Sequence, residues 1–345
     1  MAPDLHAIAV YGSIHAATRG IRAPDGGRAM SETRRSFLKA GTGLAAGIAG
    51  AVSAAHAAEP AEQAPGHAAE PISPVQVPKM KFGKAEISRL VLGTNPFYGF
   101  SHYSGNLDHA MRQWYTPERV CEILRRANQY GINAFNYVNL GRAGQDLQKF
   151  LDEGGKMTLV AQIIGDPTPT YKQFKPLAMY NQGEQVDKAW QDGEMDTVKE
   201  WCKKTRDLGS LVGVGTHQPE VIEFVEEQGW DVDFYAGCVY KRTRTGEEWK
   251  QALNGEIQEM PQETYLRSDP ARMYKVMRQT KKPCFAFKVL AAGRIGGKGV
   301  EQAFRSAFSS IKPTDGVFVG TWPYQKDEIR EDAELVAKIL NSHAT

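Results

Sequence analysis

The sequence predicts an α/β fold of the (β/α)8 TIM-barrel class, and three observations support this. From Ser88 onward, short β-branched and aromatic runs alternate with amphipathic helical segments, a pattern typical of repeated βα units and a parallel sheet. Eight strands can be counted, and eight is the number that closes such a barrel. The chain has 345 residues, of which about residues 79–345 form the folded part, the length of a single barrel.

The predicted strands are short apolar runs that end in turn residues. The fourth, LAMYN, is the weakest of the eight, because so short a run also fits a turn of helix. The eight segments are SRLVLGTN (Ser88–Asn95), NAFNYVN (Asn133–Asn139), TLVAQII (Thr158–Ile164), LAMYN (Leu177–Asn181), LVGVGTH (Leu211–His217), VDFYAGCVY (Val232–Tyr240), CFAFKVLA (Cys284–Ala291) and GVFVGTW (Gly316–Trp322).

The segments between the strands have the start and stop signals of helices. In TPERVCEILRRANQYG, Thr116 is the predicted N-cap, Pro117 stands at the first helical position, Val120 and Leu124 lie on one face, and Gly131 follows the end. Similar patterns occur in DTVKEWCKKTRDLG, PEVIEFVEEQG, DPARMYKVMRQT and KDEIREDAELVAKIL, the last of which would close the ring. The charged insertion Lys241–Ser268 is long enough to form a lid over the barrel mouth.

The N-terminal region resembles a twin-arginine (Tat) export signal. TRRSFLK (Thr33–Lys39) precedes a weakly apolar Gly/Ala segment, which ends in the small-x-small cleavage site Ala55-His56-Ala57. That segment is too short to span a bilayer, so we expect export by the Tat machinery to the periplasm without stable membrane insertion after cleavage. The alternative is a basic helix followed by an Ala/Gly linker.

This signal divides the chain into four regions. Met30 lies just before the signal, so residues 1–29 are interpreted as an over-extended gene start and residues 30–57 as the signal peptide. Residues 58–78 repeat Ala, Glu and Pro, a composition that cannot bury enough apolar surface to fold, and are predicted to be a disordered linker. Residues 79–345 form the barrel.

Charge and cysteine content exclude several classes of function. The formal net charge is +2, and no basic stripe suited to nucleic acid or membrane is present. The four cysteines are scattered without CxxC spacing, which argues against a zinc site and a disulfide framework. The predicted partner is therefore a small-molecule substrate.

In a barrel of this class, the loops after the strands carry the active site. Lys288 is the most informative residue at a strand tip, because FAFKVLAAG places an ammonium in an otherwise apolar run. It is predicted to bind an anionic substrate, to hold a sugar hydroxyl, or to attack a carbonyl as a Schiff-base nucleophile. The alternative is a lysine whose stem packs while its head reaches solvent.

His217 ends the fifth strand and precedes a helix start. It is a candidate general base, with capping of the next helix as the alternative. A metal site with Asp166 and Cys238 is disfavoured, because too few carboxylates lie at strand tips, and no metal is predicted.

Amide side chains at the strand tips form a predicted polar rim. Amides donate and accept hydrogen bonds and so suit the hydroxyls of a sugar or polyol, although each also fits a turn residue. The rim residues are Asn95, Asn136, Asn139, Gln162, Asn181 and Gln182. Tyr240 and Trp322 are predicted to offer stacking faces, and Cys238 to line the same pocket, where buried cysteine is usually inert.

Several segments in register resemble the aldo-keto reductase superfamily. ISRLVLGTNPF resembles its first strand, GINAFNYVN its second, VGVGTHQPEVIEF its fifth strand and helix, KPCFAFKVLAAGR its seventh strand and glycine turn, and DEIREDAELV its closing helix. The resemblance covers nearly all of residues 80–340. It implies a barrel of that architecture, and it would imply an NADP-dependent reductase if the catalytic residues matched.

The catalytic residues do not match. The family's Asp position is Asn136 and its Tyr position falls at or beside Gly141. Its Lys position falls at Gln162 or Ile163, and its His position at Asn181 or Gln182. Ordinary carbonyl reduction therefore lacks its proton donor.

The family's cofactor positions are also altered. The Ser-Asn pair that holds the nicotinamide amide is replaced by Gly215-Thr216, and the serine of the seventh-strand turn by Lys288. Arg330 on the closing helix only partly resembles the family's adenosine-phosphate contacts. Gly293 and Arg294, in the turn after the seventh strand, suit a phosphate or carboxylate. NADP is therefore possible but not supported by the motif positions.

These observations predict an exported enzyme that acts on a small carbonyl or sugar-type substrate. Lys288, His217 and Asn136 are the predicted catalytic residues, and the chemistry would be that of a lyase or isomerase. Two alternatives stay open: a ligand-binding barrel without catalysis, and an oxidoreductase that retains NADP tightly.

Overall fold

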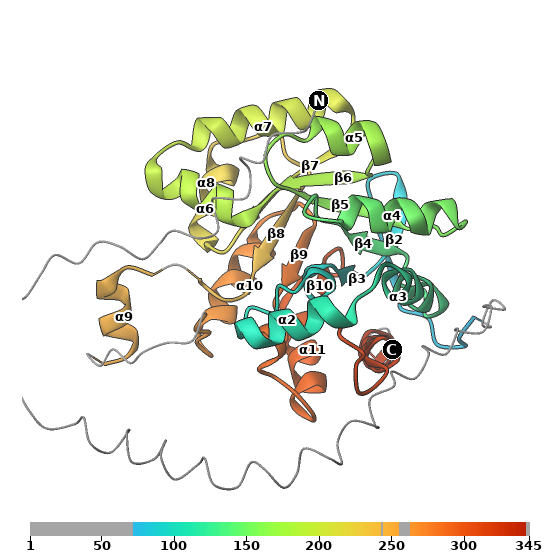
Figure 1. Ribbon diagram of the computed structural model, residues 1–345. Coiled ribbons are helices and arrows are strands. Elements are labelled where there is room, and N and C mark those ends of the chain that lie inside the picture. The colour runs from blue at the N-terminus through green and yellow to red at the C-terminus, as the bar shows by residue number, and fades with distance from the viewer. Residues whose placement is uncertain (1–71, 243, 255–262, 343–345) are drawn as a thin grey trace, which may run out of the picture. The chain divides into compact units, whose positions relative to one another are not determined.

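The computed structural model describes residues 72–242, 244–254 and 263–342. Eight parallel strands close into a barrel in the order β10-β3-β4-β5-β6-β7-β8-β9 (Figure 1). This confirms the predicted fold class and all eight predicted strands, the short fourth one included. The strands are β3 (Leu90–Gly93), β4 (Ala134–Asn136), β5 (Thr158–Ile163), β6 (Ala178–Asn181), β7 (Leu211–Thr216), β8 (Phe234–Cys238), β9 (Cys284–Phe287) and β10 (Gly316–Val319).

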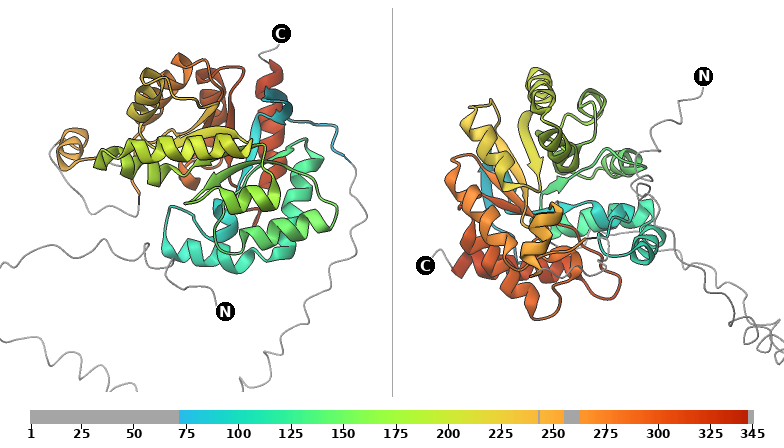
Figure 2. Two further views of the ribbon diagram at one scale, coloured as in Figure 1. Left: turned by 90° about the horizontal axis from the view of Figure 1, so that it is seen from above. Right: turned by 90° about the vertical axis from the view of Figure 1, so that its left-hand side faces the viewer.

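Helices surround the strands, as Figures 1 and 2 show. The predicted cap of α3 is present, since the Thr116 side chain accepts a hydrogen bond from the backbone N–H of Arg119. Within the described ranges, no helix is long and apolar enough to cross a membrane. The helices are α2 (Gly105–Trp114), α3 (Pro117–Gln129), α4 (Ala143–Asp152), α5 (Thr168–Phe174), α6 (Gly183–Asp192), α7 (Met195–Leu208), α8 (Pro219–Glu227), α9 (Gly246–Ala252), α10 (Asp269–Gln279), α11 (Gly299–Ser310) and α12 (Glu328–Ser342).

The barrel interior is filled by aromatic side chains that two glycines make room for. Phe285 and Phe318 stack with their ring centroids 4.6 Å apart. A Cβ atom at Gly213 would lie 2.3 Å from Cζ of Phe234, and one at Gly215 would lie 2.9 Å from Cδ2 of Tyr180. Any larger residue at these positions of β7 would therefore overfill the interior.

An antiparallel hairpin of β1 (Lys79–Phe82) and β2 (Ala85–Ser88) covers the N-terminal end of the barrel. Its Phe82 ring lies 5.2 Å from Phe234 and 5.1 Å from Phe285, in edge-to-face geometry at the starts of β8 and β9. The sequence analysis did not identify this hairpin. Each of its strands has four residues, and a burial pattern over so short a run is a weak signal in the sequence.

The structure differs from the predicted boundaries at two places. Residues 72–78 were assigned to the linker, but Val77 is buried and its backbone N–H donates to the carbonyl of Tyr130, so the barrel's contacts begin before residue 79. Strand β9 ends at Phe287 rather than at Ala291. The predicted gene start, Tat signal, cleavage site and linker up to residue 71 lie outside the described residues.

Candidate functional site

Lys288 lies at the mouth of the barrel, immediately after β9. It is not inside the strand as predicted, because its φ of 62° turns the backbone into the left-handed region, which is uncommon for a residue with a side chain. The side chain is 7% exposed, and its Nζ atom lies 2.9 Å from Oε2 of Glu263. The lysine therefore points to a buried carboxylate and not to solvent.

Glu263 is the centre of this cluster. Its Oε1 atom accepts from Nδ1 of His102 and lies 2.8 Å from Nε of Arg242. Its Oε2 atom accepts from Nζ of Lys288 and from the hydroxyl of Tyr265. Four donors from four separate segments thus converge on one carboxyl group, which we call the Glu263 cluster.

The electrostatics of the Glu263 cluster fix its charge state. Burial alone would raise the pKa of Glu263, but the hydrogen bond from His102 and the charges of Lys288 and Arg242 outweigh burial and hold the pKa far below its usual value. Burial lowers the pKa of His102, which favours a neutral ring. A neutral His102 donates through Nδ1 to Glu263 and accepts through Nε2 from Nδ2 of Asn95, at 2.9 Å.

This ion pair bears on the predicted chemistry of Lys288. A Schiff-base nucleophile must direct its amine at the substrate carbonyl, whereas Nζ of Lys288 is engaged by the Glu263 carboxylate at 2.9 Å. The geometry therefore supports anion binding by Lys288 more than covalent attack.

Aromatic rings and Arg294 enclose the Glu263 cluster. Tyr240 stacks on Tyr265 with centroids 4.7 Å apart, so it packs against the cluster as a ring face. The guanidinium of Arg294 lies over the rings of Tyr265 and Tyr103, at 4.5 and 4.9 Å from their centroids, and donates to the backbone carbonyl of Glu263. These contacts hold the backbone of Glu263 in place.

A second buried pair, His217 with Asp187, lies at the end of β7. Nδ1 of His217 is 2.7 Å from Oδ2 of Asp187, and both side chains are 6% exposed. The same carboxylate accepts from the Thr216 hydroxyl at 2.6 Å and from the backbone N–H of His217 at 3.2 Å. Among the described residues, Nε2 of His217 has no hydrogen-bond partner.

Asp187 sets the tautomer of His217. A carboxylate can only accept, so Nδ1 carries a proton, and in the neutral ring Nε2 keeps its lone pair. An imidazole held in this way by a buried carboxylate is the arrangement of a general base. His217 does not cap the following helix, because the N-cap position of α8 is Gln218 and no side-chain cap hydrogen bond is formed there.

Asn136 and Gln162 meet inside the barrel through Tyr180. Nδ2 of Asn136 donates to the Tyr180 hydroxyl at 2.9 Å and to the carbonyl of Val160 at 3.0 Å. The Tyr180 hydroxyl lies 3.1 Å from its acceptor, Oε1 of Gln162. Burial raises the pKa of Tyr180 far above its usual value, so the hydroxyl stays neutral. Asn136 is therefore part of a polar network below the mouth.

Two residues at the strand tips have unused hydrogen-bonding capacity. Oδ1 of Asn181 and Nε1 of Trp322 are buried and have no hydrogen-bond partner in the part of the chain that the structure describes. Such atoms are costly unless water or a ligand pairs with them. The Trp322 ring stacks on Tyr324 with centroids 5.2 Å apart, so one of its faces is already covered.

Other residues of the predicted rim are used by the fold itself. Asn139 joins two loops, because its Oδ1 accepts from the N–H of Ile164 and its Nδ2 donates to the carbonyl of the same residue. The Gln182 side chain caps α6 by accepting from the N–H of Gln185. Burial raises the pKa of Cys238 to about 12, so its thiol is not a nucleophile at neutral pH. All four cysteines are free and buried.

The turn after β9 does not present the donors predicted for a phosphate. The N–H groups of Gly293 and Arg294 donate to the carbonyls of Leu290 and Ala291. The Arg294 guanidinium is committed to Glu263 and Ala291, as described above. Arg330 is exposed on α12. The structure thus gives no support to a dinucleotide phosphate at Gly293 and Arg294.

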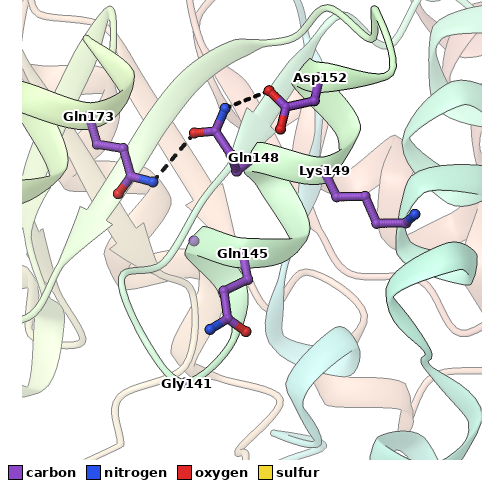
Figure 3. Close-up of a pocket in the computed structure, with 7 residues that line it drawn as sticks. Gly141, Gln145, Gln148, Lys149, Asp152 and Gln173 are labelled. Carbon is purple, nitrogen blue, oxygen red and sulfur yellow. Dashed lines mark hydrogen bonds between the residues drawn. The ribbon is translucent and has the colours of Figure 1, made fainter.

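A surface groove of about 500 Å³ lies along α4, away from these clusters (Figure 3). Gln148 donates to Asp152 one turn further along α4 and accepts from Gln173. The groove contains none of the predicted site residues, and its amides largely bond one another. It is not the predicted substrate pocket.

Sequence reasoning missed His102, Asp187 and Glu263. Asp187 lies in the first half of α6 and looks like an ordinary helix charge, and Glu263 lies in a charged insertion without periodicity. His102 is separated from Glu263 by 161 positions. A spatial juxtaposition of this kind leaves no signal in a single sequence.

No family model matches the sequence, and no curated protein is significantly similar to it. Among solved structures, a truncated 3-deoxy-D-arabino-heptulosonate 7-phosphate synthase from Thermotoga maritima is similar at 12% identity and a TM-score of 0.48, over 78% of this chain and 93% of that one. A glycerol dehydrogenase from Gluconobacter oxydans is similar at 12% identity and a TM-score of 0.45, over 77% and 95%.

A xylose isomerase-like TIM barrel protein from Mycobacterium smegmatis, in complex with magnesium, is similar at 14% identity and a TM-score of 0.38, over 74% of this chain and 97% of that one. At these values the likenesses carry no argument about reaction or substrate. The order of the eight strands itself establishes that the chain is a TIM barrel.

Proposed function

We propose that this barrel is an enzyme that transfers a proton on a small hydroxy-carbonyl compound, with His217 as the general base. The observation that supports this proposal most directly is the 2.7 Å contact between Nδ1 of His217 and Asp187. With Nδ1 engaged in this way, the neutral ring has its lone pair on Nε2, which has no hydrogen-bond partner among the described residues. This base lies at a strand tip of a TIM barrel, where such enzymes hold their substrates.

The proposed step is abstraction of the proton next to the substrate carbonyl. Nε2 of His217 takes the proton, the C–H electron pair forms a C=C double bond, and the C=O π pair moves to the oxygen, which gives an enolate. Reprotonation at a neighbouring carbon gives an isomerase, and loss of a β-substituent gives a lyase. The buried Oδ1 of Asn181 and the amide of Gln162 stand at the tips of neighbouring strands and suit substrate hydroxyls.

The cellular location is also a proposal. TRRSFLK and the Ala55-His56-Ala57 site support Tat export to the periplasm, where a freely exchanging nicotinamide cofactor would be hard to recycle. Proton transfer without a redox cofactor suits that location. An oxidoreductase that retains NADP is the competing proposal, and mass spectrometry of the native protein would detect the bound dinucleotide.

Solvent exchange tests the proposed function directly. The protein is incubated in D2O with small hydroxy-aldehydes and hydroxy-ketones, and NMR follows deuterium entering the carbon next to the carbonyl. We expect exchange with the wild type and its loss in His217→Asn. The matched control is His109→Asn, since His109 is exposed on α2, and it should exchange at the wild-type rate.

The result separates catalysis from simple binding. Ligands that bind to the wild type and to His217→Asn without any exchange would show a non-catalytic binding barrel. Exchange that persists in His217→Asn would remove His217 from the mechanism.

A further inference from the structure

We propose that His102, Arg242, Tyr265 and Lys288 form a binding site for the carboxylate of a ligand, and that the side chain of Glu263 occupies this site in the unliganded protein. The inference concerns the four donors of the Glu263 cluster, which the proposed proton transfer does not use. A small hydroxy-acid or keto-acid is the class of ligand that fits.

The arrangement of donors matches a carboxylate. Each oxygen of Glu263 has two donors: His102 and Arg242 at Oε1, and Lys288 and Tyr265 at Oε2. Two oxygens with two donors each satisfy a planar carboxylate, whereas a phosphate would bring a third oxygen without a donor. A ligand carboxylate in this place would make the same four contacts.

The charges of the cluster require an anion. Without Glu263, Arg242 would keep Glu184 as a partner, whereas Lys288 has no second carboxylate partner among the described residues. Lys288 is 7% exposed, and a buried ammonium without a counter-ion is strongly unfavourable. A ligand carboxylate therefore competes with Glu263 for the same positive charge.

The position of the site relates it to His217. Phe287, the residue before Lys288, packs edge-to-face on the His217 ring at 5.4 Å. Glu184, the partner of Arg242, follows Gly183, where a Cβ atom would lie 3.1 Å from Cε1 of His217. The carboxylate site and the base thus flank the first turn of α6. The identification of this ligand as the substrate rests on the proposed function. The binding of a carboxylate at this site does not depend on it.

Calorimetry with glycolate tests the site without any need for turnover. In Glu263→Gln the competing negative charge is gone, and a neutral amide leaves the cationic donors more readily than a carboxylate does, so glycolate should bind roughly tenfold more tightly than to the wild type. Lys288→Met added to Glu263→Gln should abolish that gain. Ethylene glycol, which has no carboxylate, should show no gain in either variant.

The control variant is Glu248→Gln, which removes a carboxylate that pairs with Lys241 at 2.8 Å on the surface and should leave glycolate binding unchanged. If Glu263→Gln fails to fold, Glu263→Asp serves instead, because the shorter side chain withdraws from the donors and should also bind glycolate more tightly than the wild type.

Equal glycolate affinity in the wild type and in the folded Glu263 variants would overturn the proposal, as would a gain that survives Lys288→Met. Inorganic phosphate binding more tightly than glycolate would overturn the choice of a carboxylate. If glycolate binds as expected and no deuterium exchange occurs, the site stands and the proposed function fails. If deuterium exchange occurs but glycolate does not bind as expected, the proposed function stands and the carboxylate site fails.

Discussion

Oδ2 of Asp187 lies 2.7 Å from Nδ1 of His217, and this carboxylate also accepts hydrogen bonds from the Thr216 hydroxyl and the His217 backbone. Three donors from one strand end thus hold the acid that orients the imidazole. Asp187 comes from α6, so the packing of this helix against β7 is what aligns the base.

The substitution Asp187→Asn should misorient the base while keeping the volume of the side chain. Its amide can donate to Nδ1, which shifts the ring proton to Nε2 and removes the lone pair that abstracts the substrate proton. We expect deuterium exchange to fall about 10³- to 10⁴-fold and stability to fall by about 1–3 kcal/mol. Nitrogen NMR of the His217 ring would report the tautomer.

The control for this variant is Asp146→Asn. Asp146 is equally buried and pairs with Arg142 at 2.8 Å, so its loss should destabilise the protein without changing the His217 tautomer. A His217 tautomer that is the same in Asp187→Asn and in the wild type would refute the assignment.

The Glu263 cluster predicts how stability depends on pH. The pKa of Glu263 is lowered in the folded state, so its ionised form contributes stability that is present above the usual value of 4.5 and is lost as pH falls through the folded pKa. The difference in melting temperature between the wild type and Glu263→Gln should therefore be largest near neutral pH and shrink below about pH 4.5.

Thermal melts of both proteins between neutral pH and pH 3 check this expectation. Glu248→Gln, which alters a half-exposed ion pair, should show a much smaller difference at every pH. A gap between wild type and Glu263→Gln that stays constant down to pH 3 would contradict the assigned ion pairs.

Cys238 should be chemically inert despite its place at a strand tip. Burial raises the pKa of its thiol to about 12, and the residue is 1% exposed. At pH 8 the thiolate is about one part in 10⁴. A thiol-specific disulfide reagent should label the native protein only after denaturant is added; one rapidly labelled thiol that disappears in Cys238→Ser would disprove this.

The barrel interior predicts the effect of adding a methyl group to β7. A Cβ atom at Gly213 would stand 2.3 Å from the Phe234 ring, which is fully buried. Gly213→Ala should cost about 1–3 kcal/mol or more in the free energy of unfolding. Denaturant melts measure this cost, and Gly105→Ala is the control, since nothing lies within 4 Å of its Cβ position.

The sequence predicted the barrel because its strands are encoded locally. Runs such as those of β7 and β8 are β-branched, small or aromatic and end in polar residues, so period and composition alone identify them. It also identified Lys288 and His217, because a polar group at the end of an apolar run is unusual. The positions of these two residues at the ends of apolar runs were sufficient to identify them as candidate site residues.

The partners of these two residues were not predictable in the same way. Lys288 depends on Glu263, which lies 25 positions away in a charged insertion, and His217 depends on Asp187, which lies 30 positions away on a helix with other charges. The sequence analysis also gave Asn139 and Gln182 to substrate, whereas the Asn139 amide bonds the backbone of a neighbouring loop and the Gln182 amide caps α6. An amide at a strand tip fits either use, and only the position of the next loop decides.

The β1–β2 hairpin determines by which end of the barrel a ligand can enter and leave. Its phenylalanine closes the floor of the barrel, so a molecule that reaches the buried amides and rings can arrive only from above and must depart by the same route. A ligand bound at that end of the barrel would then have to leave before another could take its place.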